Sequence, residues 1–295
     1  MNTIAVLMTC YNRKEKTIAC LKSLYDSYCT SNSRFEIELF LTDDGCTDGT
    51  AYAVNELNLG LKINIIKGNG ALYWNGGMIY AWKSALRKDG FDGFLLLNDD
   101  TIVLPEFWND LKNADEISIK RTGKKGVYVG STYDKSSQKF TYGGFNFVSK
   151  WTLKDVFVYP NGKDFQQCQC AHGNITYISN DVVKTMGIFC EDYIHGGSDH
   201  DYTYRAYKKG FPIFVMPHYC GICENDHLKE RKVLSEMSFV ERLRYMRSPF
   251  GYNLHNTLLF QKRCFPHRYP FVLVMGGIRL LFPAIAEYLY LRSRK

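Results

Sequence analysis

Three common motifs for phosphate binding and nucleophilic catalysis are absent from this sequence. No Gly-x-Gly-x-x-Gly follows the first apolar run, where dinucleotide-binding proteins need glycines to bring the backbone close to a pyrophosphate. There is neither a Gly-x-x-x-x-Gly-Lys-Ser/Thr loop nor a Gly-x-Ser-x-Gly turn. These absences exclude a dinucleotide-dependent oxidoreductase of the usual kind, a P-loop nucleotidase and an α/β-hydrolase.

The chain also lacks internal repeats, long linkers and a biased composition. Its 295 residues are 45% hydrophobic and 23% charged, which is ordinary for a globular protein of one or two domains. No basic stretch precedes an apolar core near Met1, so we expect a cytoplasmic protein whose cysteines are reduced and mostly buried. Cys220-x-x-Cys223 and Cys168-x-Cys170 are too irregularly spaced to indicate a structural zinc site.

The excess of positive charge lies at the end of the chain. Residues 226–295 contain 13 Lys and Arg against 5 Asp and Glu, a net charge of +8, whereas residues 1–225 have a net charge of −1. The basic residues alternate with long apolar runs, which favours contact with anionic lipid over nucleic acid. We therefore expect a peripheral contact with the inner face of the cell membrane and no nucleic-acid partner.

Residues 271–291 form an apolar segment long enough to span a bilayer. The segment contains Arg279, Pro283 and Glu287, and charges near a bilayer centre are costly. A helix that lies in the membrane interface is therefore favoured, and a helix that packs on the rest of the protein is the alternative.

Short apolar runs alternate with helical patterns in the first hundred residues. Strands are predicted at 4–8, 37–41, 63–66 and 94–97, and helices at 14–28, 50–57 and 77–86. This order predicts an α/β fold with a parallel sheet between two layers of helices. In such sheets the ligand lies beyond the carboxyl ends of the strands, so polar residues just after each strand are candidates for a site.

The pattern changes after residue 125. Shorter strands are predicted at 127–129, 140–147 and 176–178, and helices at 180–186 and 198–209. Asn180 is expected to cap the first of these helices and Gly210 to end the second. Residues 1–225 are expected to form one domain, followed by a helical extension over residues 226–295.

Two strand ends carry paired carboxylates. Asp99 and Asp100 follow a run of leucines, and adjacent buried carboxylates repel each other unless a cation is present. Hard oxygen ligands of this kind bind Mg²⁺ or Mn²⁺, although Asn-Asp-Asp also favours a simple turn. Asp43 and Asp44 precede Gly45, where an acceptor could take the N–H of a nucleobase; a turn before a capped helix is the alternative.

A third acidic segment, Gly196-Gly197-Ser198-Asp199-His200-Asp201, opens a predicted helix. An acid in this position is stabilised by the helix dipole, so capping alone would explain it. Asp199 is also held at a fixed point by the helix, as a general base would need to be.

Taken in order, four of these segments resemble the family 2 glycosyltransferases of the GT-A fold. The resemblance covers about residues 3–220, and the loop over residues 68–77 is similar to that of bacterial rhamnosyltransferase-like members. The four segments are Val6 to Arg13, Thr42 to Gly49, Leu97 to Asp100, and Ser198 to Tyr202 with Arg205.

The resemblance implies roles for particular residues. Asp100 would coordinate Mg²⁺ or Mn²⁺ on the donor diphosphate, with His218 as a further ligand. Asp199 would be the catalytic base, with Asp201 the alternative because Ser198 stands where the family commonly has Glu. Nucleotide contacts fall on Thr9, Tyr11, Asn12, Arg13, Asp44, Asn69 and Asp99. Contacts with the sugar or the acceptor fall on Trp74, Asn75 and Asp201.

The function implied is an inverting, metal-dependent transfer of a hexosyl group. The donor would be a dTDP- or UDP-linked sugar, and the acceptor a hydroxyl of a glycan or lipid-linked precursor of a surface polysaccharide. A sugar-nucleotide nucleotidyltransferase would need a glycine-rich loop in place of Thr9-Cys10-Tyr11-Asn12. A non-catalytic binding or scaffold protein of the same fold would be expected to lose acidic residues that this sequence keeps.

Overall fold

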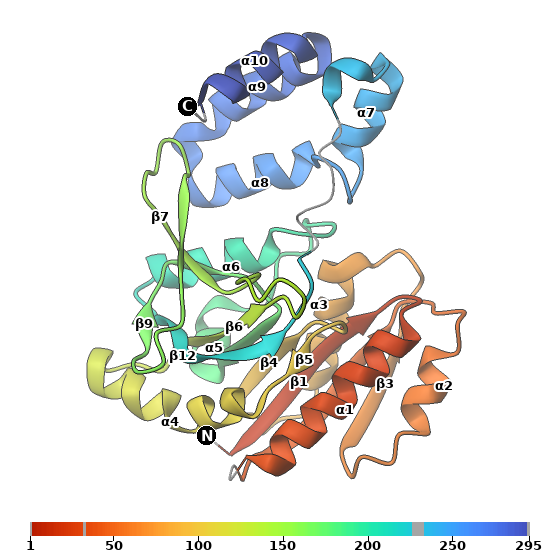
Figure 1. The fold of residues 1–295 in the computed structure, drawn as a ribbon, viewed down its shortest axis with the longest axis vertical. Coiled ribbons are helices and arrows are strands. Elements are labelled where there is room, and N and C mark those ends of the chain that lie inside the picture. The colour runs from red at the N-terminus through yellow and green to blue at the C-terminus, as the bar shows by residue number, and fades with distance from the viewer. Residues whose placement is uncertain (1, 32–33, 226–232, 294–295) are drawn as a thin grey trace.

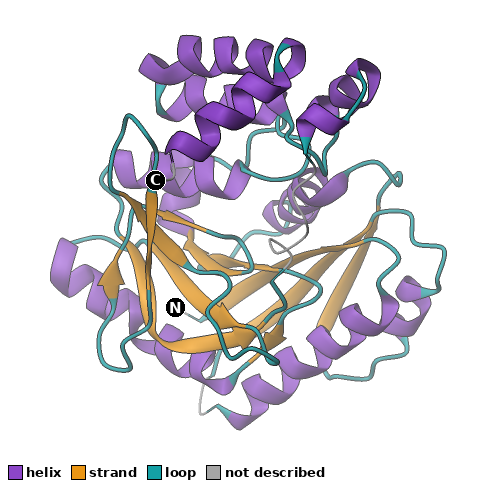
Figure 2. Cartoon of the chain, turned by 45° about the horizontal axis from the view of Figure 1, so that its top comes forward, coloured by secondary structure: helices purple, strands orange, loops and turns teal. Residues whose placement is uncertain are grey.

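The computed structural model describes residues 2–31, 34–225 and 233–293 (Figure 1). Residues 226–232, the start of the expected C-terminal extension, therefore lie outside the described residues. A nine-stranded sheet lies between two layers of helices, and a group of helices from the end of the chain sits beyond one side of the sheet (Figure 2).

The first half of the sheet follows the sequence prediction. Four parallel strands lie in the order β3-β2-β1-β4: β1 (Thr3–Cys10), β2 (Glu36–Asp43), β3 (Lys62–Lys67) and β4 (Gly93–Leu97). The helices α1 (Lys14–Thr30), α2 (Thr50–Asn55) and α3 (Tyr73–Leu86) connect them, and α3 begins four residues earlier than expected. Strand β1 packs Val6 against α1 and Leu7 against α3. Burial on both faces explains why the strands read as continuous apolar runs.

The second half of the sheet, for which the sequence predicts no strand direction, is not parallel throughout. Strand β11 (Ile175–Ser179) lies antiparallel between β4 and β6 (Val127–Tyr133), and β12 (Ile213–Ile222) runs parallel to β6. Short strands β5 (Ile102–Val103) and β9 (Gln166–Gln167) pair with β12.

Three further helices cover this half. Helix α4 (Pro105–Thr122), which was not predicted, packs with α1 on one face of the sheet, and α5 (Asn180–Met186) and α6 (Ser198–Lys208) pack with α3 on the other. Ser179, not Asn180, is the N-cap residue of α5, because Asn180 already has helical geometry. Gly210 follows α6 at φ +79°, as expected of the residue that ends it.

A small three-stranded sheet lies beside the main one. It has the order β10-β7-β8, with β7 (Gly144–Phe147), β8 (Asp155–Val158) and β10 (Cys170–Ala171). The strand predicted at 140–147 is shorter than expected, since Phe140 forms only an isolated bridge with Tyr133. Phe145 of this sheet joins Tyr204 and Phe265 in a separate hydrophobic cluster.

The end of the chain is helical. Its helices are α7 (Phe239–Arg247), α8 (Leu254–Cys264), α9 (Tyr269–Leu281) and α10 (Pro283–Ser293), with 3₁₀ turns η2 (Leu234–Glu236) and η3 (Pro266–Arg268). The single helix expected over 271–291 is interrupted at Phe282, whose φ of −130° and ψ of 62° are not helical. None of the helices in the described part of the chain is long and apolar enough to cross a bilayer.

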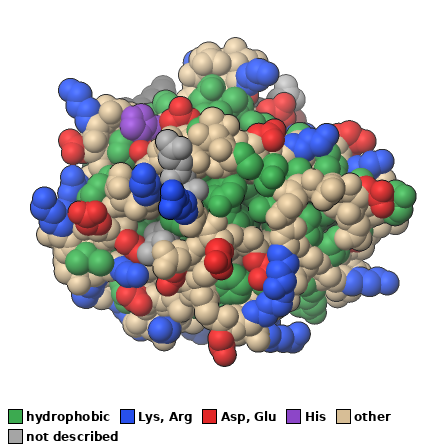
Figure 3. All heavy atoms as spheres, turned by 90° about the horizontal axis from the view of Figure 1, so that it is seen from below, with side chains coloured by type: hydrophobic (Ala, Val, Ile, Leu, Met, Phe, Trp, Pro, Cys, Tyr) green, Lys and Arg blue, Asp and Glu red, His purple; other side chains and the backbone are tan. Residues whose placement is uncertain are grey.

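The face opposite α7–α10 carries charges of both signs. Figure 3 shows that Lys and Arg side chains are intermingled there with Asp and Glu side chains. A face that binds nucleic acid instead gathers positive charge in a patch or stripe.

Candidate active site

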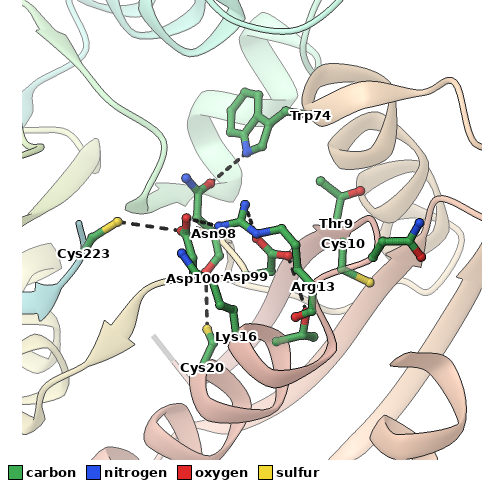
Figure 4. A network of polar contacts seen from close by, with 12 residues as sticks. Thr9, Cys10, Arg13, Lys16, Cys20, Trp74, Asn98, Asp99, Asp100 and Cys223 are labelled. Atoms are coloured by element: carbon green, nitrogen blue, oxygen red, sulfur yellow. Dashed lines mark hydrogen bonds and ion pairs between the residues drawn. The ribbon is translucent and has the colours of Figure 1, made fainter. Parts of the chain in front are cut away.

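The carboxyl ends of β1, β2 and β4 meet at one edge of the sheet. Thr9 and Cys10 lie in register with Thr42 and Asp43, and Leu7 is paired with Leu96 on β4. The polar residues that follow these strands are therefore brought together, as Figure 4 shows for Arg13 and the carboxylates that it faces.

Arg13 joins both members of the carboxylate pair. Its guanidinium lies 3.2 Å from Asp99 Oδ1 and also contacts Asp100 Oδ2. The Asp99 side chain is 7% exposed, and Thr17 Oγ1 donates a hydrogen bond of 3.4 Å to its Oδ2. Burial raises the pKa of Asp99 to about 7, an effect that Arg13 opposes and Asp100 reinforces.

The carboxylate pair fits a hard divalent cation. Two nearly buried carboxylates lie side by side and share the Arg13 guanidinium, so oxygens of both are gathered at one point. Carboxylate oxygens are the ligands that Mg²⁺ and Mn²⁺ prefer. Cys223 lies beside this pair, with its Sγ 3.7 Å from Asp100 Oδ1.

Asp44 uses both carboxylate oxygens to hold the loop before α3. It accepts hydrogen bonds from the backbone N–H groups of Gly70 (2.8 Å), Leu72 (2.9 Å) and Tyr73 (3.1 Å). Gly68 is packed so closely that an added Cβ would lie 2.6 Å from Asp44 Oδ1. In this structure Asp44 therefore shapes the loop and caps α3, and three of its four lone-pair sites are already used.

The other predicted nucleotide residues lie around this loop. Tyr11 is 54% exposed, so its ring is accessible to a planar ligand. Asn12, at φ +49°, accepts a 2.7 Å hydrogen bond from the Thr47 backbone N–H and so ties the end of β1 to the loop after β2. Thr9 lies against α3, and Asn69 is exposed with its Oδ1 accepting from the Ala71 N–H.

Asp199 and Asp201 have different surroundings, although both are in the first turn of α6. Asp199 accepts from the backbone N–H groups of Gly173 (3.0 Å) and His200 (2.9 Å), and its side chain is 14% exposed. Asp201 is fully buried between Arg205 and Arg263, each with its Nε 2.8 Å from a carboxylate oxygen. Asp199 is therefore the candidate base. Asp201 was expected to contact the sugar or the acceptor, but its buried position between two arginines contradicts this expectation.

The segment just before β11 connects Asp199 with the carboxylate pair. Gly173 donates to Asp199, and the next residue, Asn174, donates from Nδ2 to Cys223 Sγ at 3.6 Å. The Asn174 carbonyl also accepts from the Asn98 backbone N–H at 3.0 Å. The base and the carboxylate pair thus lie on either side of one short segment.

Trp74 and Asn75, both predicted to contact a sugar, have different surroundings. Trp74 donates from Nε1 to Asn98 Oδ1 at 2.8 Å, and its ring packs on Phe189. Asn75 is fully buried, and its Nδ2 donates to the carbonyl oxygens of Cys190 and Tyr193. Asn75 therefore fixes the segment before α6, and the structure corrects its expected role as a sugar contact.

His218 does not belong to this site. Its Nδ1 lies 3.0 Å from Asp110 Oδ1 of α4, and its backbone N–H donates to the same carboxylate. The ring of His218 is thus placed against a carboxylate of α4, whereas Asp100 contacts Cys223, which follows the end of β12. The structure gives no support to the expected role of His218 as a metal ligand.

A cluster of two aromatic rings and one imidazole ring at the edge of the site was not predicted from the sequence. His195 lies 5.0 Å from Phe250 between ring centroids, and Tyr73 lies 5.7 Å from Phe250. Burial lowers the pKa of His195, although Asp199 acts in the opposite direction. The position of His195 just before the Gly196-Gly197 turn was an available signal. Phe250 belongs to a distant part of the chain, and no local pattern marks it.

Comparisons with known proteins agree with this geometry. The sequence profile described as Glycosyl transferase family 2 matches residues 5–187. Among curated proteins, none is similar enough in sequence to count as a match.

Several solved structures share the fold. The mannosyltransferase PcManGT from Pyrobaculum calidifontis, in complex with GDP-Man and Mn²⁺, is 15% identical over 96% of this chain and 71% of its own, with a TM-score of 0.54. Residues 1–349 of TarS from S. aureus, in complex with UDP-GlcNAc, are 13% identical over 91% of this chain and 73% of their own, with a TM-score of 0.55. GalNAc-T7 with UDP, GalNAc and Mn²⁺ is 13% identical over 77% of this chain and 44% of its own, with a TM-score of 0.57.

The profile match covers more than half of the chain and includes β1, β2 and β4 with the polar residues that follow them. The similar structures show the same arrangement of a sheet between helices. The protein therefore has the GT-A fold and belongs to glycosyltransferase family 2.

Proposed function

We propose that the protein transfers a hexosyl group from a dTDP- or UDP-linked sugar to a hydroxyl of a glycan or lipid-linked acceptor, as in surface polysaccharide synthesis. The observation that carries the proposal is the position of Asp199. It is the partly exposed carboxylate at the start of α6, connected through residues 173–174 to the Asp99–Asp100 pair. One base without a protein nucleophile gives inversion at the anomeric carbon.

In this mechanism Asp199 takes the proton of the attacking hydroxyl. Asp199 lies at the N-terminal end of α6, where the Gly173 N–H holds the carboxylate in place. Asp100, supported by Asp99, would hold Mg²⁺ or Mn²⁺. The ion, when bound, neutralises charge that develops on the leaving diphosphate.

Arg13 and Tyr11 are the proposed contacts with the donor. The Arg13 guanidinium already lies at the carboxylate pair, where a diphosphate would be held, and arginine binds phosphate through two parallel N–H groups. Tyr11 offers its exposed ring to the nucleobase. The complexes of PcManGT with GDP-Man and Mn²⁺ and of GalNAc-T7 with UDP, GalNAc and Mn²⁺ support a nucleotide sugar and a divalent ion as the ligands.

Removing Asp100 is expected to abolish metal-dependent nucleotide binding. At a hundred times the Kd, UDP or dTDP with Mn²⁺ should stabilise the native protein by about 2.7 kcal/mol and raise its Tm by roughly 4–5 °C. EDTA should remove the shift, and so should Asp100→Ala, because the ion loses its main ligand. Asp155→Ala, which removes an exposed carboxylate on β8, is the matched control. A nucleotide shift that is equal in EDTA and in Mn²⁺ would contradict the metal assignment.

We propose in addition that α9 and α10 lie on an anionic membrane surface at the cytoplasmic side. Phe271, Val274, Leu281, Phe282, Ile285 and Tyr288 are all more than half exposed. On the other side of α9, Gly276 packs so closely on α8 that an added Cβ would lie 2.8 Å from Leu254. An apolar face within a segment of net charge +8 suits a lipid surface more than a protein surface.

Vesicle binding tests this surface. We expect the protein to sediment with vesicles that contain phosphatidylglycerol and less with pure phosphatidylcholine, and added salt should weaken the binding because surface charges are screened. A Phe271→Glu, Ile285→Glu double variant should stay in the supernatant, because two charges would enter the acyl boundary. Val156→Glu, at an equally exposed apolar position on β8, should sediment like the native protein. Sedimentation of the double variant at the native level would count against the proposal.

A further inference from the structure

A second group of metal-ligating side chains lies at the ends of β1 and β2. The ligand atoms of Cys10, Asp43 and Cys46 are all within 4.8 Å of one another, and the structure shows no comparable group elsewhere among residues 2–31, 34–225 and 233–293. The two Sγ atoms are 3.8 Å apart. The backbone N–H of Asn12 points at Cys46 Sγ, with a donor–acceptor distance of 3.2 Å.

The sulfur–sulfur distance matches two thiolates on one ion. A tetrahedral ion with metal–sulfur bonds of about 2.3 Å places two sulfur ligands about 3.8 Å apart. A disulfide would need the sulfurs at about 2.05 Å, which is far from their separation here. The geometry thus fits shared coordination better than a covalent bond.

The donor set selects a different ion from the one proposed at Asp100. Thiolates prefer thiophilic ions such as Zn²⁺, whereas Mg²⁺ and Mn²⁺ prefer oxygen. Asp43 Oδ1 accepts from the Cys46 backbone N–H at 2.8 Å, which orients the carboxylate and leaves its other oxygen for a metal. Cysteine binds a metal ion as the thiolate, so binding would release the protons that thiols ordinarily carry at neutral pH.

We propose that Cys10, Asp43 and Cys46 form a binding site for Zn²⁺, separate from the carboxylate pair. Three protein ligands leave the fourth tetrahedral position open to water or to an added group. The ion would join the end of β1 to the loop after β2, beside the hydrogen bond between Asn12 and Thr47. This proposal does not depend on the transferase function.

Cobalt is the probe for this site, because Co²⁺ bound by thiolates absorbs in the near ultraviolet and Co²⁺ bound by oxygen does not. We expect the full-length protein, kept reduced with a phosphine, to develop this band with one equivalent of Co²⁺ and to lose it when Zn²⁺ is added. Binding of Zn²⁺ at neutral pH should release close to two protons. Cys46→Ser should weaken binding by more than about a hundredfold, since even residues that only orient a ligand are worth 10- to 100-fold.

Controls separate this site from other thiols and from misfolding. Cys29→Ser, at an exposed position on α1, should keep the band. Cys10 is buried, so the Cys10→Ser result is used only if the circular dichroism of this variant matches that of the native protein. If it does not match, the test of the zinc site relies on Cys46→Ser, because Cys46 is only half-buried. Absence of the band, or its persistence in folded Cys46→Ser, overturns the proposal.

Discussion

Asp199→Asn is expected to lower kcat by about 10²- to 10⁴-fold, the usual worth of a general base. The amide keeps an oxygen that can accept the Gly173 N–H, so the start of α6 should keep its shape, but it cannot take a proton from the acceptor hydroxyl. The Tm should therefore change little, and the Tm shift produced by nucleotide should remain. The measurement is kcat with donor in excess, alongside thermal unfolding with and without nucleotide.

Asp181→Asn is the matched control for this experiment. Asp181 is an exposed acid in the first turn of α5, so the substitution removes a carboxylate from an equivalent helix position away from the site. Its kcat should stay close to the native value. If Asp199→Asn retained more than half of the native kcat, Asp199 would not be the base.

Asp201→Ala is expected to destabilise the protein by about 1.5–3 kcal/mol, because it removes the shared hydrogen-bond acceptor of Arg205 and Arg263, whose side chains are 23% and 29% exposed. For a protein of this size the loss corresponds to a fall in Tm of roughly 2–5 °C. Arg263→Ala should cost less, since Asp201 keeps its ion pair with Arg205. Thermal unfolding of the two variants, with Asp155→Ala as an exposed control, measures both effects.

Activity distinguishes the two aspartates. Protein with Asp201→Ala that remains folded at low temperature should keep much of its kcat, because Asp201 is fully buried and faces Arg263. Full stability combined with lost activity would instead make Asp201 the base and leave Asp199 as a helix cap.

The parallel half of the sheet was predictable because each strand is a short apolar run with a helical pattern after it. Helix α4 was missed although its signals were present: Pro105 begins it, Gly123 follows it at φ +73°, and Trp108, Leu111 and Ala114 are buried on one side. The antiparallel insertion of β11 between β4 and β6 could not be predicted in the same way. Strand direction depends on where the chain returns, and the local pattern of residues 175–179 contains no such information.

The site was predictable in its location but not in the use of its atoms. Asp44 and Asp99 both follow strands, yet Asp44 is occupied by three backbone N–H groups that only the fold of residues 70–73 brings to it. Asp199 and Asp201 are two positions apart on a helix and so point to nearly opposite sides, which means that only one could face the site. The buried one is Asp201, and the partner that shows this, Arg263, lies 62 residues further along the chain.

The ion pair between Asp201 and Arg263 also has a consequence for the acceptor. It ties α6, which carries Asp199, to α8, and α8 in turn packs closely on α9 through Leu254 and Gly276. If α9 and α10 rest on a bilayer, Asp199 is held at a constant height above the lipid headgroups. Acceptors would then be selected by how far their terminal hydroxyl projects from the membrane, and lengthening the segment between α8 and α9 should change the preferred chain length of the acceptor.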